Sequence, residues 1–288
     1  MTRKANSPWI YLLVPTLCLQ PSLQAQEPSY ALSTGKQDEV RLAILNELHN
    51  PSTLSKLNIT PGVRVLTLGC GIGLLELEIA KQAGHHGYVL GTDVSAEQIF
   101  IAEQNCDVEN LEFCQMDALH TDQVKGTFDR IHCRYVLTHL PWENIVTIIP
   151  LLYSKLTSGG FLLLEEISAI DSLFCEPPHP GYDLWKIVVS KQFALQKSDT
   201  SPGLRILHYL QEQKYRVLHT SYQPILRTKR EKSILSLGIL SASKKLLQEQ
   251  LCTLKEIEET LELLYQLEQD TAYSPRYNEI SQIIVLKP

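Results

Sequence analysis

Three glycines at alternate positions, Gly69, Gly71 and Gly73, follow an apolar run in the segment VLTLGCGIGLLEL, residues 65–77. The apolar run predicts a buried strand, and the residues after Gly73 predict the start of a helix. The first N–H groups of a helix lack intrahelical partners and bear a partial positive charge. Glycine leaves that surface open, because it has no side chain to block a ligand. We therefore expect this strand-to-helix turn to bind a ligand through its backbone.

Asp93 is the second residue that suggests chemistry. It follows the strand-like run of residues 88–92 and lies 20 residues after Gly73. In doubly wound sheets an acid at this place accepts hydrogen bonds from both hydroxyls of a ribose. The alternative is that Asp93 caps a helix beginning near Ser95. We favour the ribose because the glycine loop precedes it.

Two further positions follow predicted strands. Asp117 comes after residues 111–115 and can accept a hydrogen bond from an adenine amine while Met116 covers the ring; an ordinary turn acid is the alternative. Arg134 follows residues 128–133, beside the point where the strand order reverses and where ligands of such sheets bind. Arg134 suits a carboxylate ligand, and the alternative is an exposed loop arginine.

These side chains can meet only if a parallel sheet brings the carboxyl ends of the strands together. Strand-like and helical runs alternate, which predicts an α/β fold with a doubly wound, mostly parallel, seven-stranded sheet. The predicted strands are 63–68, 88–92, 111–115, 128–133, 160–166, 215–221 and 280–286. The predicted helices of the sheet region are about 74–83, 96–105 and 142–156, preceded by a helix at 35–50 and a second short one that begins at Pro51.

We expect one domain over residues 29–288, with two helical insertions. The strand–helix rhythm stops after residue 166, and segments of about 171–200 and 232–270 predict helices that form a lid. Within the second segment, the chain is expected to be helical without a break from Lys232 to Gln269.

Composition excludes some classes of ligand. Lys and Arg total 26 against 32 Asp and Glu, which gives a net charge of −6. A nucleic-acid partner is not expected, because phosphate neutralisation needs a basic face. The seven cysteines form no Cys-x-x-Cys pair and no Cys/His cluster of zinc spacing, and no pair of acids stands at metal-ligand positions. We therefore expect no metal site.

Residues 1–28 are predicted to lie outside the fold. A basic start, the apolar run WIYLLVPTLCL and small residues after it are typical of a secretory signal. The alternative is an unstructured extension on a cytoplasmic protein, and we favour the cytoplasm. The apolar run is short and contains Pro15, so no stable membrane insertion is expected.

Together, these segments resemble the class I S-adenosylmethionine-dependent methyltransferases. VLTLGCGIG is similar to the family's first motif, GTDVS to its second-strand acid, MDA to its adenine contact and LTSGGFLLLEE to the start of its fifth strand. The flanking segments YALSTGKQDEVRL and SPGLRILHYLQEQKYRV are similar to small-molecule methyltransferases. The resemblance implies S-adenosylmethionine as the cofactor and a small organic methyl acceptor; it does not fix the oligomeric state.

The resemblance also assigns roles to residues. The glycine loop would hold the methionine part of the cofactor, Asp93 its ribose and residues 116–118 its adenine. Arg134 would lie at the methionine end, and Tyr30 would close over the cofactor. The implied cofactor-binding residues are Tyr30, Gly69, Cys70, Gly71, Gly73, Asp93, Gln98, Met116, Asp117, Ala118 and Arg134.

Thr67 departs from the family pattern. Members of the family usually have Asp or Glu two residues before the first glycine, and here that residue is Thr67. Threonine accepts a hydrogen bond but has no charge. We therefore expect either a weaker cofactor affinity or a contact supplied by another residue.

The chemistry implied by the resemblance is an in-line displacement of a methyl group from a sulfonium. The protein aligns the acceptor and excludes water, and it needs a base only if the acceptor arrives protonated. The candidate catalytic residues are His139 and, at the end of the fifth strand, Glu165 or Glu166, with Glu165 the one chosen; each has a structural role as its alternative.

Two other functions remain open. One is a non-catalytic binding or scaffold protein on the same fold, which the Thr67 departure favours. The other, less favoured, is an NAD(P)-dependent oxidoreductase. The glycine spacing opposes it, because the nicotinamide fingerprint needs a glycine at position 74, which is Leu74.

Overall fold

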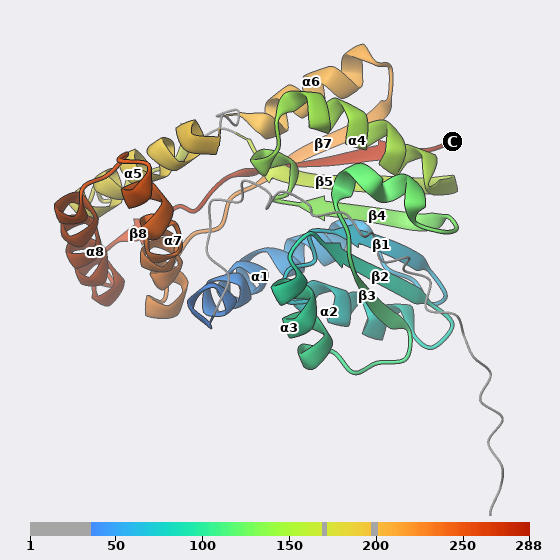
Figure 1. The fold of residues 1–288 in the computed structure, drawn as a ribbon, viewed down its shortest axis with the longest axis horizontal. Helices are drawn as coiled ribbons and strands as arrows, with labels where there is room; N and C mark the ends of the chain where they lie inside the picture. The colour runs from blue at the N-terminus through green and yellow to red at the C-terminus, as the bar shows by residue number, and fades with distance from the viewer. Residues whose placement is uncertain (1–35, 169–171, 197–200) are drawn as a thin grey trace, which may run out of the picture.

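The computed structural model describes residues 36–168, 172–196 and 201–288, and the predicted signal-like segment, with Tyr30, lies outside them (Figure 1). The first half of the chain alternates strands and helices. Its elements are α1 Lys36–Leu57, β1 Arg64–Leu68, α2 Leu74–Ala83, β2 Tyr88–Asp93, α3 Ala96–Asn105, β3 Leu111–Gln115, the 3₁₀ turn η1 Ala118–Gln123, β4 Phe128–Arg134, the 3₁₀ turn η2 Leu137–His139, α4 Trp142–Ser154 and β5 Leu156–Ile167.

The second half contains most of the helices outside the sheet region. Its elements are β6 Cys175–Glu176, α5 Pro180–Gln196, α6 Pro202–Glu212, β7 Arg216–Tyr222, α7 Lys229–Gln248, α8 Leu254–Gln269, β8 Ser274–Pro275 and β9 Ile280–Leu286. The seven strands and the sheet-region helices match the predicted ranges closely. The short pair β6–β8, which forms a second, antiparallel sheet, was not predicted.

The main sheet has seven strands in the order β3-β2-β1-β4-β5-β9-β7. The pairs from β3 to β5 are parallel, and β9 lies antiparallel between β5 and β7. The prediction of a doubly wound, mostly parallel sheet is confirmed. The strand order reverses between β1 and β4, so the carboxyl ends of these two strands form the position where such sheets bind ligands.

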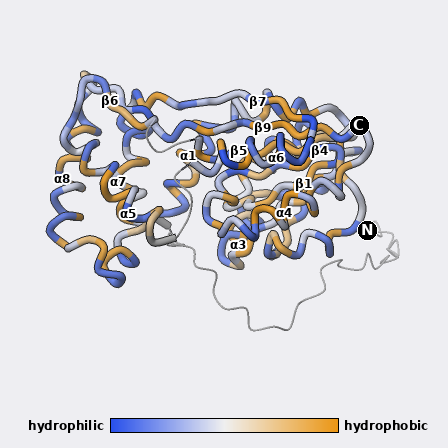
Figure 2. The backbone as a smooth tube through the Cα atoms, turned by 90° about the horizontal axis from the view of Figure 1, so that it is seen from above, coloured by the Kyte–Doolittle hydropathy of each residue, from blue (hydrophilic) through white to orange (hydrophobic). Residues whose placement is uncertain are grey.

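Helices cover both faces of the sheet (Figure 1). On one face, α4 and α6 pack over apolar side chains of β1, β4, β5 and β9. On the other face, the end of α1 and α2 pack over a second apolar cluster that includes Leu57, Val65, Ile79 and Val89. Figure 2 shows the apolar stretches concentrated in the sheet and alternating with polar ones along the outer helices.

A third layer lies beyond the carboxyl ends of the parallel strands. There α5, α7 and α8 pack together against α1, and Figure 1 shows them at the left, away from the sheet. These three helices, called the cap below, occupy the segments in which a lid was predicted. No described helix is long and apolar enough to cross a membrane.

The predicted break at Pro51 is wrong, because α1 runs on through it. Proline removes one helical hydrogen bond, which weakens a helix at that point. Here Arg134 of β4 donates to Asn46 and Asn50 before the proline and to Thr53 after it, at 3.0, 3.0 and 2.8 Å. Contacts on both sides of Pro51 hold the two turns in line.

The predicted unbroken helix from Lys232 to Gln269 is also wrong, because α7 ends at Gln248 and α8 begins at Leu254. Thr253 and Glu256 form a capping box, in which each side chain accepts from the backbone N–H of the other residue. Gln250, at φ 56°, lies in the left-handed region between the helices. The apolar periodicity continues across the gap, so the pattern alone did not reveal the turn.

Candidate cofactor and active site

The glycine loop, residues 69–73, connects β1 to α2 and requires its glycines for two different reasons. All three have positive φ, 68°, 54° and 78°. A Cβ on Gly69 would lie 2.2 Å from Val136 Cγ2, and one on Gly73 would lie 2.7 Å from Phe113. Gly71 has more room, with Leu42 nearest at 3.7 Å. Two of the three glycines therefore allow close packing of the loop, and Gly71 is the one that leaves its surroundings open.

Asp93 joins the glycine loop to β2. One carboxylate oxygen accepts from the Gly71 N–H at 3.0 Å, and the other accepts from the Ser95 N–H at 2.9 Å. Burial raises the pKa of Asp93, and these backbone N–H groups oppose the rise. The cap of α3 is Ser95 itself, whose hydroxyl accepts from the Gln98 N–H. A carboxylate can accept several hydrogen bonds, so the ribose contact stays a prediction compatible with this geometry.

The residues predicted to contact adenine lie beside Asp93. Asp93 pairs with Gln115 in the β2–β3 register, and the Met116 N–H donates to the Asp93 carbonyl at 2.8 Å. Asp117 is exposed and begins η1 by accepting from the Leu119 N–H at 2.9 Å. On α3, Gln98 is buried, and its carbonyl oxygen has no hydrogen-bond partner among the described residues. The structure thus brings Asp93 and residues 116–118 to neighbouring strand ends, whereas Gln98 lies on the helix that follows Asp93.

Arg134 is not an exposed loop residue. Its side chain is 8% exposed, and its guanidinium is engaged with three side chains of α1, as described above. It lies 4.0 Å from Glu165, which is a long ion pair. The structure gives Arg134 the role of docking α1 onto the sheet, and its predicted contact with the methionine end remains a prediction.

Glu165 and Glu166 are neighbours on β5 but point to opposite faces, as successive strand residues do. Glu165 is fully buried and accepts from Thr53 at 2.7 Å and from Gln282 at 2.6 Å, with His132 Nε2 at 2.9 Å. Burial by itself raises its pKa, but the hydrogen bond and charge of His132, Arg134 and Thr53 bring the pKa down to about 2. A carboxylate with so low a pKa is a weak base. These contacts therefore favour a structural role for Glu165 over a catalytic one.

Glu166 supports the segment that follows β4. Its carboxylate accepts from the backbone N–H groups of Val136, Leu137 and Thr138 at 3.2, 2.9 and 3.0 Å. Burial raises its pKa to about 7, although these hydrogen bonds act to lower it. His139 ends η2, half-buried, and its backbone N–H donates to Val136. A catalytic role of His139 stays a prediction.

Sequence reasoning missed an aromatic group at the end of β4. Tyr135 has φ 56°, an uncommon backbone conformation for a residue other than glycine, and its hydroxyl lies 3.1 Å from Nε2 of buried His49. The His49 ring makes edge contacts with Tyr135 and Tyr222, with centroids 5.4 and 5.7 Å apart, and lies 6.4 Å from Tyr277. These side chains come from α1, β7 and the segment before β9, so no local motif connects them.

Sequence reasoning also missed Glu76, on the buried face of α2. Its side chain is 2% exposed, and Leu75, Ile79 and Ala80 are buried on the same helix. The available signal was an acid among the apolar positions of an amphipathic helix, three residues after Gly73.

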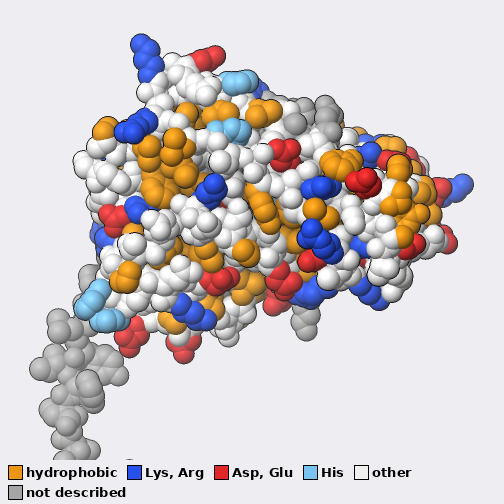
Figure 3. All heavy atoms as spheres, turned by 180° about the vertical axis from the view of Figure 1, so that it is seen from behind, with side chains coloured by type: hydrophobic (Ala, Val, Ile, Leu, Met, Phe, Trp, Pro, Cys, Tyr) orange, Lys and Arg blue, Asp and Glu red, His pale blue; other side chains and the backbone are white. Residues whose placement is uncertain are grey.

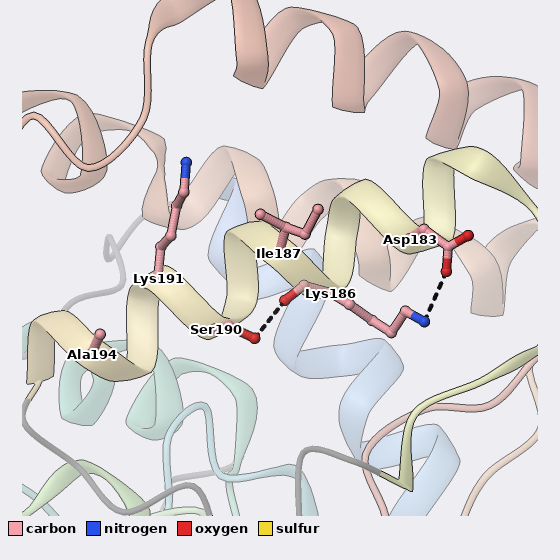
Figure 4. A pocket seen from close by; sticks show the side chains of 6 residues that line it. All are labelled: Asp183, Lys186, Ile187, Ser190, Lys191 and Ala194. Carbon is pink, nitrogen blue, oxygen red and sulfur yellow. Dashed lines mark hydrogen bonds and ion pairs between the residues drawn. The ribbon is translucent and has the colours of Figure 1, made fainter.

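A hollow of about 620 Å³ lies apart from these residues, along α5 (Figure 4). Its described lining belongs to that one helix and includes the ion pair of Lys186 and Asp183, at 2.7 Å. It contains no buried polar group that would hold a cofactor. The described residues also contain no group of three or more His, Cys, Asp and Glu side chains placed to hold a metal ion.

The comparison with known families agrees with the fold and the glycine loop. Residues 65–160, from β1 into β5, match the family described as "Methyltransferase domain". This part of the chain is therefore similar to a methyltransferase domain, in agreement with the predicted resemblance to the class I, S-adenosylmethionine-dependent enzymes.

Relatives with assigned names match a similar part of the chain. A demethylmenaquinone methyltransferase of Lactococcus lactis is 28% identical over 126 residues, which are 43% of this chain and 49% of the relative. A ubiquinone biosynthesis O-methyltransferase of Glaesserella parasuis is 30% identical over 132 residues, 43% of this chain and 54% of the relative. A ribosomal protein L11 methyltransferase of Pelobacter propionicus is 27% identical over 146 residues, 50% and 43% of the two chains. This chain spans about half the length of the relatives it matches.

Solved structures extend the likeness to the whole fold. The mycolic acid cyclopropane synthase CmaA1, complexed with SAH and CTAB, superposes with a TM-score of 0.54 over 89% of both chains at 16% identity. A cyclopropane-fatty-acyl-phospholipid synthase-like protein of Lactobacillus casei gives a TM-score of 0.56 over 88% of this chain and 95% of that chain, at 13% identity. At such low identity these matches show a common fold.

The packing of the glycine loop predicts that alanine lowers the unfolding free energy more at Gly69 than at Gly62. Gly69→Ala combines a positive φ, about 1–2 kcal/mol, with a clash against Val136, about 1–3 kcal/mol. Gly62→Ala is the matched control, because Gly62 also has a positive φ but no described atom lies within 4 Å of its added Cβ. Urea unfolding should show a larger loss of unfolding free energy for Gly69→Ala. Equal losses would contradict the packing role of Gly69.

The buried position of Glu165 predicts a pH dependence of stability. Its pKa of about 2 lies below the ordinary 4.5, so its stabilisation is complete above pH 4.5 and is lost as the pH falls toward 2. The unfolding free energy of the wild type should therefore fall by about 3 kcal/mol more than that of Glu165→Gln over this range. Urea titrations at several pH values measure the difference, with exposed Glu109→Gln as the control. Parallel pH profiles for the wild type and Glu165→Gln would refute this assignment.

Proposed function

We propose that this protein transfers the methyl group of S-adenosylmethionine to a small organic molecule. The observation that carries the proposal is the glycine loop fastened by Asp93 at the point where the strand order reverses. A buried oxygen of Glu76, near Asp93, has no hydrogen-bond partner among the described residues and suits a ligand with hydrogen-bond donors. The solved CmaA1 complex contains SAH on the same fold, which supports the choice of cofactor.

The residues present fit the parts of this cofactor. Gly71 would leave room beside the loop for its methionine part, Asp93 would accept from its ribose, and residues 116–118 would contact its adenine. When bound, the cofactor supplies a methyl group already activated on a cationic sulfur. The task of the protein is then to hold the acceptor in line with that methyl group and to exclude water.

The cap is one reason to propose a small molecule as the methyl acceptor. The cap helices and α1 enclose an apolar core beyond the carboxyl ends of the strands, and the aromatic group of His49, Tyr135, Tyr222 and Tyr277 lies at its border with the sheet. On the face shown in Figure 3, acidic and basic side chains are interspersed and form no continuous basic surface. Such a surface does not favour nucleic acid. Two of the relatives have names that refer to quinone methylation, whereas a third acts on a ribosomal protein by its name.

A transfer assay tests the proposed reaction. Purified protein is incubated with methyl-labelled S-adenosylmethionine and a cell extract, and the label is followed in the small-molecule, protein and nucleic-acid fractions. We expect label in the small-molecule fraction. Label confined to protein or nucleic acid would contradict the acceptor class. Cofactor binding without any transfer would instead support the scaffold alternative.

Asp93→Ala tests the cofactor site. Removing the carboxylate should weaken S-adenosylmethionine binding by about 1–3 kcal/mol, because the ribose hydroxyls lose their acceptor and the loop loses its fastening. Isothermal titration measures the affinity, with Asp107→Ala on the exposed turn after α3 as the control. Unchanged affinity would remove Asp93 from the site. Binding of NADH in place of S-adenosylmethionine would favour the oxidoreductase alternative.

A further inference from the structure

Glu76 lies in the first turn of α2, beneath the glycine loop. Gly73, the N-cap of this helix, has no side chain to satisfy the exposed N–H groups, and the nearby backbone N–H of Glu76 acts to lower the pKa of the Glu76 carboxyl group. A carboxylate at a helix N-terminus is favoured by the helix dipole. Glu76 is nevertheless buried to 2% exposure, which is unusual for an acid without a charged partner.

The surroundings of Glu76 leave part of its carboxylate unsatisfied. The Thr67 hydroxyl of β1 lowers the pKa of Glu76 as a hydrogen-bond donor would, and neither Thr67 Oγ1 nor Glu76 Oε2 has another hydrogen-bond partner among the described residues. Burial raises the pKa of Glu76 to about 7, and Asp93 contributes to the rise, whereas Arg134 lowers it. Arg134 is committed to α1, so it does not form an ion pair with Glu76 in the part of the chain that the structure describes.

A buried oxygen without a partner destabilises the protein, and its presence calls for an explanation. Here two such oxygens, from Glu76 and Thr67, lie close enough to interact with each other, and both belong to elements that flank the glycine loop. Both can accept hydrogen bonds, and one belongs to a carboxylate, so the ligand that fits them is a cation with several N–H donors. A primary ammonium group has this chemistry.

We propose that Glu76 and Thr67 bind the ammonium group at the amino-acid end of the cofactor. This inference rests on the function proposed above and adds to it a binding residue that the sequence motif did not indicate. The carboxylate that the resemblance places at position 67 of β1 comes instead from α2, and Thr67 adds a second acceptor. The family pattern has its carboxylate on the strand β1, at position 67, whereas this protein has it on the helix α2, at Glu76.

Glu76→Gln tests the assignment through three ligands. S-adenosylmethionine and S-adenosylhomocysteine both have the ammonium group, whereas 5′-methylthioadenosine keeps the adenosine and sulfur but lacks the amino-acid end. Isothermal titration should show at least tenfold weaker binding of the first two by Glu76→Gln and unchanged binding of the third. Glu97→Gln, an exposed acid in the first turn of α3, is the matched control and should bind all three as the wild type does.

A thermal melt of the free protein separates ligand binding from a structural role. Because the Glu76 carboxylate is buried with an unpartnered oxygen, its neutral amide replacement should melt at the same temperature as the wild type or higher. A lower midpoint, or an equal loss of affinity for all three ligands, would overturn the assignment.

The outcomes distinguish the two proposals. If the wild type binds S-adenosylmethionine and Glu76→Gln binds it equally well, the role of Glu76 is refuted and the proposed function stands. If the wild type binds none of the three ligands, both proposals fail.

Discussion

A buried carboxylate at the end of β5 holds the parts of this protein together. Glu165 has hydrogen-bond partners on β4, β9 and α1, and its neighbour Arg134 bonds three more side chains of α1. Helix α1 in turn contacts the cap, because the buried carboxylate of Asp38 on α1 accepts from Ser241 of α7 as well as from Arg41 of its own helix. Because buried charges are tolerated only when they are paired and hydrogen-bonded, this network fixes one position of α1. Because the cap packs against α1, the position of α1 also determines where the cap lies relative to the strand ends.

The glycine loop depends on a second set of contacts. Gly69 packs against Val136, and Val136 is held by the Glu166 carboxylate on the opposite face of β5 from Glu165. Gly73 packs against Phe113 of β3, and Gly71 is held by Asp93 of β2. The loop is therefore supported by three strands before any ligand arrives. Such preorganisation reduces the entropy that binding must overcome.

Much of the fold could be predicted from the sequence because its signals are local. Apolar runs of strand length, separated by amphipathic helical stretches, gave the strands and the helices between them within a few residues. One error fell where a distant contact opposed a local rule. Pro51 predicted a helix start, but Arg134 of β4 holds the turns on both sides of it. The other error has a local cause, because the helical periodicity across residues 249–253 hid a turn whose signal, the capping box of Thr253 and Glu256, is present in the sequence itself.

The candidate site divides in the same way. The sequence by itself determined the glycine loop, the acid after β2 and the residues after β3, because each lies at a fixed distance from a strand end and parallel strands bring those ends together. Only the tertiary structure decided what the acids do. Glu165 and Glu166 are consecutive, yet one fixes α1 and the other the segment after β4, because strand residues alternate between faces. Only the packing of α2 on β1 brings Glu76 to Thr67, since the environment of a buried charge is set by neighbours distant in the chain.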